Sequence, residues 1–312
     1  MSPVENSPSI TTAGTLPAKT RHRLFSFARV WAISSNTLLE LVRLKVFYFL
    51  LIFALLIIGS AGFSEALNLR FQDQFQILED WSLGAMSIFT ILLATLATAN
   101  MLPKEIEDRT LYTILAKPVP RLEYLMGKLL GMYLLLLIST IIMSAMFMVA
   151  LYAKYHLLAG ATMQQYSGER ASQLPRVMKD LEQHAFPISL VPCVIAIYLK
   201  AILLATLTMM ISTFSTTYIF TLFVSFTCYF IGSIEATARD YVLTPATGEG
   251  IKLFLRVVTL LFPDLQLFNL VDDIVAGNTI AMSLFMKTAG LGVAYVFVYA
   301  LVAYVVFSSK EL

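Results

Sequence analysis

The sequence predicts an all-α integral membrane protein, and two observations support that class. Hydrophobic residues make up 58% of the 312 residues and charged residues only 13%, whereas soluble domains are typically about 25% charged. Six stretches are apolar over lengths close to the roughly 20 residues that a helix needs to cross the hydrocarbon of a bilayer. A chain with so few charges cannot cover a soluble globule of this size with polar surface.

The chain before the first apolar stretch has two parts. Residues 1–23 are rich in Ser, Thr and Pro and contain no apolar run, so we expect a disordered cytoplasmic tail rather than a signal peptide. Residues 24–45 mix apolar and basic positions at helical spacing, with Phe, Trp and Leu beside Arg. This pattern favours an amphipathic helix along the membrane interface, although a plain cytosolic helix would show the same periodicity.

Residues 46–312 are expected to form one transmembrane domain with six helical spans. The predicted spans are about 46–63, 82–102, 129–152, 189–211, 217–234 and 284–307. A further apolar segment, 251–262, is about 12 residues long, carries Lys252 and Arg256, and is followed by Pro263. It is too short to span, so we expect an interfacial or re-entrant helix there.

Basic residues near the span ends predict the orientation. They gather before span one and again between spans two and three, whereas the loop between spans one and two carries a single basic residue, Arg70, among several acidic ones. The N-terminus, the insert between spans two and three, and the C-terminus are therefore expected in the cytoplasm. The longer loops 153–187 and 235–283 also contain basic residues, but long loops follow this rule poorly.

The insert between spans two and three, residues 103–128, is rich in charge and has the features of a short helix. Pro103 suits a first helical turn, and Pro118 ends the helix. Ile106, Thr110 and Ile114 recur at i, i+4 and i+8 and line one face. Acidic residues gather in the first turns, where the helix dipole favours them. The apolar stripe can be covered by lipid, by the protein's own helices or by a groove on a partner.

The same insert resembles the cytoplasmic-loop signature of ABC-type-2 permeases, the six-span membrane subunits of one class of ABC exporters. The matching positions are Glu107, Arg109, Thr110, Leu111, Leu115, Ala116, Lys117, Pro118, Val119, Arg121, Tyr124, Leu125, Gly127 and Lys128. The likeness extends more loosely from about residue 24 to the end of the chain. Loops 153–187 and 235–283 carry no recognisable motif.

The resemblance implies that the insert contains a coupling helix, which docks in a groove on a separate ATP-binding subunit. It also implies a second permease protomer, in a homodimer or a heterodimer, within the cell inner membrane. The residues expected at the ATPase-coupling interface are Glu105, Glu107, Asp108, Arg109, Thr110, Leu111, Leu115, Lys117, Pro118 and Arg121. ATP and Mg²⁺ would be bound by the partner, and no cofactor is expected in this chain.

Motifs for other chemistry are absent from the sequence. There is no G-x-x-x-x-G-K-[ST] phosphate loop, since Gly127–Lys128 lacks the upstream glycine and the following Ser or Thr. No G-x-S-x-G, H-E-x-x-H or Cys–His arrangement occurs. His156 and His184, 28 residues apart, are weak candidates for a metal site. Nothing indicates a nucleic-acid partner. These absences agree with the resemblance, which implies a transport subunit and not an enzyme.

Lys200 is the one clear ionisable candidate inside a span. A lysine in a membrane helix is costly and is a functional candidate by default. If span four begins at Val194, Lys200 lies about 9 Å inside it at 1.5 Å per residue and can snorkel outward. We favour snorkelling or a structural pair, with Glu235 as the nearest plausible partner, because no acidic residue is clearly at its depth.

Two further motifs favour packing. Gly127 and Gly131 form G-x-x-x-G at the start of span three, and this spacing lets helices approach closely. Because it follows the insert directly, packing within the chain is favoured over dimerisation. Residues 262–269, FPDLQLFN, carry turn and cap signals at Pro263 and Asn269. We expect packing there, with a gate or substrate exit as the alternative.

Three functions are therefore weighed. The first is the permease subunit of an ABC exporter. The second is a non-transporting subunit of the same kind, which transmits ATPase work to an extracytoplasmic partner through the long external loops. The third, a multi-pass membrane enzyme, needs polar groups that converge inside the bilayer, and Lys200 alone qualifies.

Overall fold

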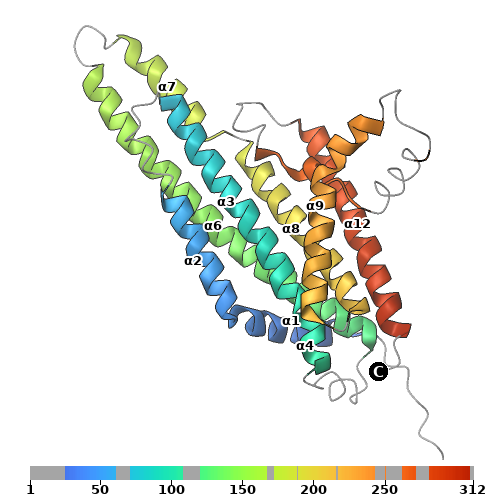
Figure 1. Cartoon of the computed structure of the whole chain (residues 1–312). Coiled ribbons are helices and arrows are strands. Elements are labelled where there is room, and N and C mark those ends of the chain that lie inside the picture. Colours follow the sequence, from blue (N-terminus) through green and yellow to red (C-terminus); the bar gives the residue numbers. More distant parts are fainter. Residues whose placement is uncertain are drawn as a thin grey trace, which may run out of the picture.

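A computed structural model shows a bundle of helices, and the prediction of an all-α membrane protein is confirmed (Figure 1). The structure describes residues 25–60, 71–107, 120–166, 172–187, 189–215, 217–242, 250, 262–271 and 281–309, and these contain no strand. The elements are α1 (Phe27–Val42), α2 (Lys45–Ser60), α3 (Phe71–Ala99), α4 (Met101–Glu107), α6 (Arg121–Gln165), α7 (Leu174–Ala185), α8 (Leu190–Phe214), α9 (Tyr218–Val242), the 3-10 helix η3 (Leu265–Phe268) and α12 (Met282–Ser309).

Helix α8 forms the centre of the bundle. It packs against α3, α6, α9 and α12. Most of its residues are buried, including the small residues Ala196, Ala201 and Ala205. Small side chains let neighbouring helices approach closely, which is the main source of helix association in a membrane.

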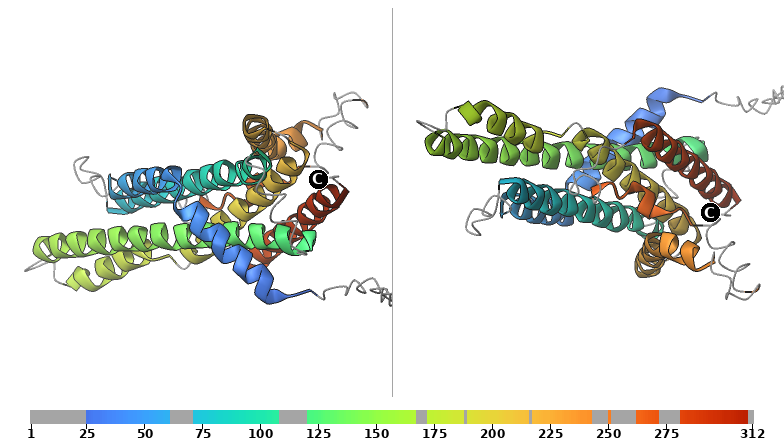
Figure 2. Two further views of the ribbon diagram at one scale, coloured as in Figure 1. Left: turned by 90° about the horizontal axis from the view of Figure 1, so that it is seen from below. Right: turned by 90° about the horizontal axis from the view of Figure 1, so that it is seen from above.

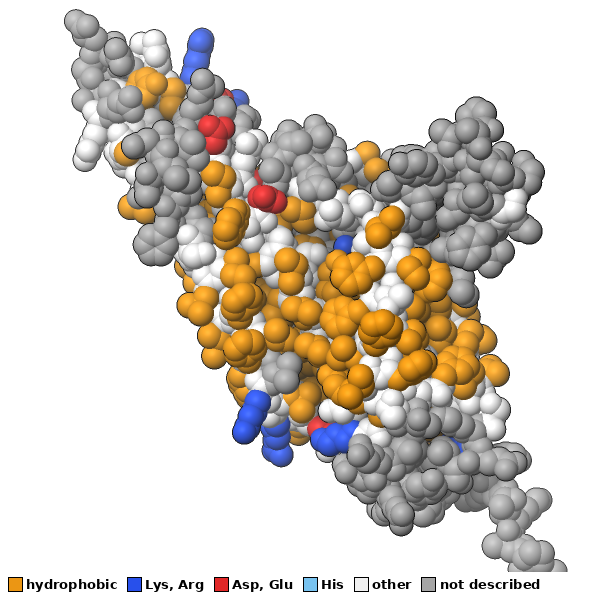
Figure 3. Space-filling view, in the orientation of Figure 1, with side chains coloured by type: hydrophobic (Ala, Val, Ile, Leu, Met, Phe, Trp, Pro, Cys, Tyr) orange, Lys and Arg blue, Asp and Glu red, His pale blue; other side chains and the backbone are white. Residues whose placement is uncertain are grey.

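The surface of the bundle carries a broad band of hydrophobic side chains (Figure 3). Large apolar residues such as Phe223, Ile141 and Phe297 are exposed there. An exposed apolar surface of this extent is incompatible with water and suits the hydrocarbon of a bilayer. The protein is therefore a multi-pass membrane protein.

Four helical stretches are long and apolar enough to cross a membrane by themselves. They are Asp73–Glu105, Arg121–Gln164, Leu190–Phe214 and Met282–Ser309. The pair α1 and α2 would make a fifth, and the apolar part of α9, Tyr218–Ile234, is shorter. All six predicted spans thus coincide with helices among the described residues, while the count of six membrane crossings stays a prediction.

The two ends of the bundle differ, and we name them by the helices they carry. Figure 1 shows α1, α4 and the end of α12 at one end, the α1 end, and α7 at the other, the α7 end. Helix α1 is bent by 66° from α2 and crosses the first turns of α6 obliquely (Figure 2). The first and last described residues of the chain both lie at the α1 end.

Helix α6 is longer than predicted. A span was expected over 129–152 with an external loop from 153 to 187, but α6 continues to Gln165 and α7 packs back against it. Its 45 residues correspond to about 67 Å at 1.5 Å per residue. Pro175 lies in the first turn of α7, where a missing N–H costs nothing.

The segment 262–271 packs as predicted. Leu265 and Phe268 of η3 are buried, and Asp264 accepts a hydrogen bond from the Gln266 backbone N–H at 3.0 Å, which starts the short helix. Asn269 forms its C-cap. Residues 251–261, for which an interfacial or re-entrant helix was expected, lie outside the described residues.

Candidate coupling site

The structure describes the two ends of the charged insert. The first end is α4, whose last residue is Glu107, and the second is Pro120 with the first turns of α6. Seven of the predicted interface residues lie outside the described part of the chain, and so does the end of the predicted helix at Pro118. They are Asp108, Arg109, Thr110, Leu111, Leu115, Lys117 and Pro118.

Helix α1 packs on the beginning of α6 through the predicted G-x-x-x-G motif. A Cβ atom added to Gly127 would lie 2.7 Å from the Cβ of Ile33, and one added to Gly131 would lie 2.7 Å from the Cβ of Thr37. Real Cβ atoms do not approach so closely, so only glycine fits at these two positions. The prediction that this motif serves packing within the chain is confirmed.

A buried carboxylate fixes the same pair of helices one turn earlier. Glu123 lies on the stripe of Gly127 and Gly131, and its side chain is 0% exposed. Its Oε2 lies 2.5 Å from Nε of Arg29, its Oε1 accepts from Nη2 of Arg29 at 2.7 Å, and the backbone N–H of Ser26 donates to Oε1 at 3.0 Å. A bidentate Arg–carboxylate pair of this kind fixes orientation as well as distance.

A second cluster of charges connects α4, α6 and α1. Nζ of Lys128 lies 2.5 Å from Oε1 of Glu105 and 3.5 Å from Oε2 of Glu40. The hydroxyl of Tyr124 donates to the other oxygen of Glu105. Lys104 and Glu40 are 3.8 Å apart and largely exposed, so that pair contributes little. The two ends of the insert are therefore tied to each other through Glu105 and Lys128.

The start of α6 also contacts the end of α12. Nη1 of Arg121 donates to the carbonyl oxygens of Phe307 at 3.2 Å and of Ser308 at 2.6 Å. The rings of Tyr124 and Phe307 stack with centroids 5.8 Å apart. A cation at the last carbonyls of a helix is favourable because those oxygens lack intrahelical partners. The base of the insert thus reaches α1, α6 and α12.

Comparison with known protein families identifies the family of the chain. The family model for "ABC-2 family transporter protein" matches residues 31–312. The chain belongs to the ABC-2 transporter family. None of the curated proteins matches the sequence. The suggested resemblance to ABC-type-2 permeases is confirmed.

The ABC-2 family assignment gives the coarse function. The chain is a permease subunit of an ABC transporter, a membrane transport subunit. Permeases of this family generally work as dimers and with an ATP-binding subunit. The geometry above therefore belongs to a transporter in which both ends of the insert are tied to neighbouring helices.

Two predicted interface residues of this ABC-2 permease occupy anchoring positions. Glu105 is buried and bonded to Lys128 and Tyr124, so it fixes α4 and does not present its side chain outward. Arg121 is bonded to the end of α12. Glu107 ends α4, and its side chain is outside the described atoms.

The anchoring partners were missed by reasoning from the sequence. They are Ser26, Arg29, Glu40, Glu123, Tyr124 and Lys128. Tyr124 and Lys128 belong to the family-like motif and stand four residues apart, which places them on one helical face. That spacing is a signal that could have singled them out. Arg29 and Glu123 are separated by 94 residues, and no local pattern connects them.

Lys200 of the ABC-2 permease is buried at 7% exposure. It is the eleventh residue of α8, about 15 Å from Leu190 at 1.5 Å per residue, and its Nζ lies 5.8 Å from the centre of the Tyr229 ring. No acidic residue was expected at its depth, but Asp80 of α3 lines the same pocket. Tertiary packing, which the sequence does not display, places both residues around one pocket.

No metal site appears in the described ranges, where no group of three or more His, Cys, Asp and Glu side chains converges. His156 packs edge-on against the ring of Tyr152, with centroids 4.3 Å apart. Cys193 and Cys228 are buried and unbridged.

Proposed function

We propose that this ABC-2 permease is the membrane subunit of an exporter, driven through its insert 103–128 by a separate ATP-binding subunit. The observation that carries the proposal is the anchoring of both ends of the insert. Glu105 and Lys128 tie α4 to α6, and Arg29 and Glu123 tie α6 to α1. A displacement of the insert would therefore move these helices together, as a coupling element requires.

Within this proposal the predicted interface residues fall into two roles. Asp108, Arg109, Thr110, Leu111, Leu115, Lys117 and Pro118, with Glu107 before them, would form the surface that enters the groove of the ATPase. Glu105 and Arg121 would hold that surface in position through their contacts with α6 and α12. ATP and Mg²⁺ would be held by the ATPase, and a second permease protomer would complete the pathway.

The proposed location is the cell inner membrane with both termini and the insert in the cytoplasm. The α1 end carries Arg29, Arg43, Lys45 and Lys104 among the described residues, and basic residues favour the cytoplasmic side. Exposed Phe27 and Trp31 on α1 fit a helix that lies in the membrane interface.

Affinity purification of the tagged full-length protein from its native membrane tests the coupling. We expect an ATPase with a phosphate loop to copurify with the wild-type protein. Arg109→Glu should abolish the capture because it reverses a charge at the docking surface. Leu111→Asp combined with Leu115→Asp should do the same because it places charge on an apolar docking face. Arg176→Glu, a charge reversal on exposed α7 at the other end of the bundle, is the matched control and should capture normally.

Undiminished capture and transport in the Arg109→Glu protein would refute the docking site. Capture of no ATPase by the intact wild-type protein, across several detergents, would refute the motor itself.

A second candidate function is favoured by one observation, the projection of α6 and α7. Figure 1 shows the last turns of α6 and α7 projecting beyond the neighbouring helices. With the span at the predicted residues 129–152, they would extend past the bilayer. This helical hairpin offers a surface through which ATPase work could reach an extracytoplasmic partner. Cross-linking from exposed Lys179 of α7 in whole cells tests it, and a partner recovered only with Lys179 present would favour this reading.

A further inference from the structure

A polar pocket lies between α3, α8, α9 and the segment 262–271, away from the coupling site. Its volume is about 270 Å³, just below the range of roughly 300 to 1,000 Å³ that holds whole drug-sized ligands. Side chains with charges or hydrogen-bonding groups surround it, among them Asp80, Lys200, Gln266 and Asn269. Pockets of this polarity are unusual between membrane helices, where polar groups mark functional sites.

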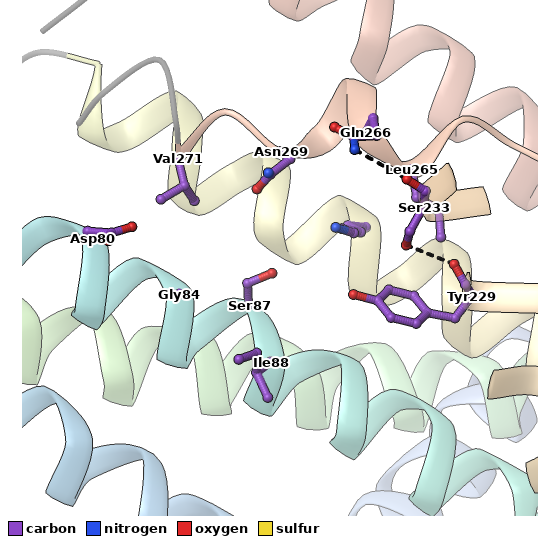
Figure 4. A pocket seen from close by; sticks show the side chains of 11 residues that line it. Asp80, Gly84, Ser87, Ile88, Tyr229, Ser233, Leu265, Gln266, Asn269 and Val271 are labelled. Atoms are coloured by element: carbon purple, nitrogen blue, oxygen red, sulfur yellow. Dashed lines mark hydrogen bonds between the residues drawn. The ribbon is translucent and has the colours of Figure 1, made fainter. Parts of the chain in front are cut away.

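The pocket has opposite charges toward opposite ends. Figure 4 shows Asp80 at one end and Tyr229, Ser233 and Gln266 at the other. The ammonium of Lys200 lies 5.8 Å from the centre of the Tyr229 ring, so the cation belongs to the Tyr229 end. A ligand that satisfies both ends carries an anionic group and a cationic group.

The wall formed by the segment 262–271 is held in a fixed position. A Cβ atom on Gly232 of α9 would lie 2.8 Å from the Pro263 carbonyl oxygen, and one on Gly292 of α12 would lie 2.8 Å from the Phe268 ring. The side-chain N–H of Gln266 donates to the Ser233 carbonyl oxygen at 3.2 Å (Figure 4). The pocket is therefore preformed, which lowers the cost of binding.

The pocket is continuous with the lipid-facing surface. Ile88, one of its lining residues, is 62% exposed, and Phe230 and Ile234 are exposed nearby on α9. Figure 3 shows a small basic patch near α8 and α9 with hydrophobic side chains beside it. A ligand here would have its polar group in the pocket and apolar chains against the hydrophobic band.

We propose that this pocket binds the headgroup of a zwitterionic phospholipid with a primary amine. The phosphate would pair with Lys200, and the ammonium would lie toward Asp80 and donate hydrogen bonds to its carboxylate. An anionic headgroup without an amine would bring no cation to the Asp80 carboxylate, which would stay unneutralised. The site does not depend on the docking of an ATPase.

Native mass spectrometry of the full-length protein tests the proposal. The protein is placed in nanodiscs of phosphatidylcholine that contain equal amounts of phosphatidylethanolamine and phosphatidylglycerol, then released and analysed for retained lipid. We expect wild type to retain phosphatidylethanolamine. Lys200→Met should weaken retention about tenfold, because a charge-assisted contact to phosphate is lost. Lys200→Arg keeps the charge and should retain the lipid.

Three further results decide the assignment. Lys287→Met, at an exposed position of α12 outside the pocket, should retain lipid like wild type. Asp80→Asn, an isosteric change at an exposed position, should shift the retained lipid toward phosphatidylglycerol. Unchanged retention in both Lys200→Met and Asp80→Asn would overturn the proposal. So would displacement of the lipid by free phosphoethanolamine at equal concentration, which would assign the pocket to a soluble ligand.

Discussion

Lys128 and Glu105 form the ion pair on which the base of the insert depends. Both side chains are nearly excluded from solvent, at 5% and 11% exposure. Taking two charges out of water is costly, and a 2.5 Å contact and the added hydroxyl of Tyr124 offset part of that cost. Loss of one partner would leave the other charge buried alone.

We therefore predict a strong dependence of stability on this pair. Lys128→Met alone should destabilise the protein by about 3 to 5 kcal/mol, because the Glu105 carboxylate would remain buried without its cation. The double variant Lys128→Met with Glu105→Leu should recover part of that loss. Thermal unfolding of wild type, Lys128→Met, Glu105→Leu and the double variant in detergent gives the comparison, and strictly additive effects would contradict the assignment.

At the scale of helices, α1 and α6 are joined by matched stripes. Glu123, Gly127 and Gly131 on α6 face Arg29, Ile33 and Thr37 on α1, and each set advances by four residues. Ridges formed by residues four apart pack into grooves of the same kind. The interface combines one buried ion pair with two positions where the backbones nearly touch.

This geometry predicts that no larger residue can replace Gly127 or Gly131 without loss of stability. Gly131→Ala should lower stability by about 1 to 3 kcal/mol, since its Cβ would lie 2.8 Å from the Ser34 carbonyl oxygen. Gly160→Ala on the same helix meets nothing within 4 Å and should be neutral or stabilising, because alanine favours helix over glycine. The measurement is the unfolding temperature in detergent, and equal effects of the two changes would argue against close packing of α1.

Helix α6 also shows the limit of hydropathy at this scale. The apolar stretch 129–152 identifies the part that suits lipid, and polar residues beyond it predict a loop. The helix nevertheless continues to Gln165, because Leu151 and Ala159 on α6 and Leu181 and Ala185 on α7 are buried, and α7 packs on α6. Burial between two helices stabilises helical structure that the polarity of the segment does not predict.

For the whole molecule, the main prediction is the orientation. The chain has two tryptophans, Trp31 on α1 and Trp81 on α3, with 63% and 57% of their surface exposed. Trp31 lies at the α1 end, and α3 extends from Trp81 toward the α7 end, where it contacts α7. The two residues therefore report opposite sides of the membrane.

Single-tryptophan variants in sealed inside-out vesicles test this orientation. With the α1 end in the cytoplasm, externally added iodide should quench Trp31 in the Trp81→Phe protein and spare Trp81 in the Trp31→Phe protein. Right-side-out vesicles provide the control and should give the reverse pattern. Quenching of Trp81 alone in inside-out vesicles would contradict the predicted orientation and place the α7 end in the cytoplasm.

Much of the architecture follows from the sequence. The composition excludes a soluble domain, and the apolar stretches fall on α2, α3, α6, α8, α9 and α12. The periodicity of residues 24–45 predicts α1, and the prolines and the motif between 103 and 128 mark the insert. These features are local, because hydropathy, helix periodicity and proline geometry act over one or a few turns.

The pairing of distant side chains was decided by the tertiary structure. Arg29 meets Glu123 across 94 residues, and Asp80 and Lys200 line one pocket from different helices. Such contacts depend on the rotation and depth of each helix in the bundle, which side-chain packing against several neighbours sets together. The sequence by itself therefore determined that this is a helical permease with a charged insert. Packing decided how the ends of that insert are anchored and that Lys200 lines a pocket shared with Asp80.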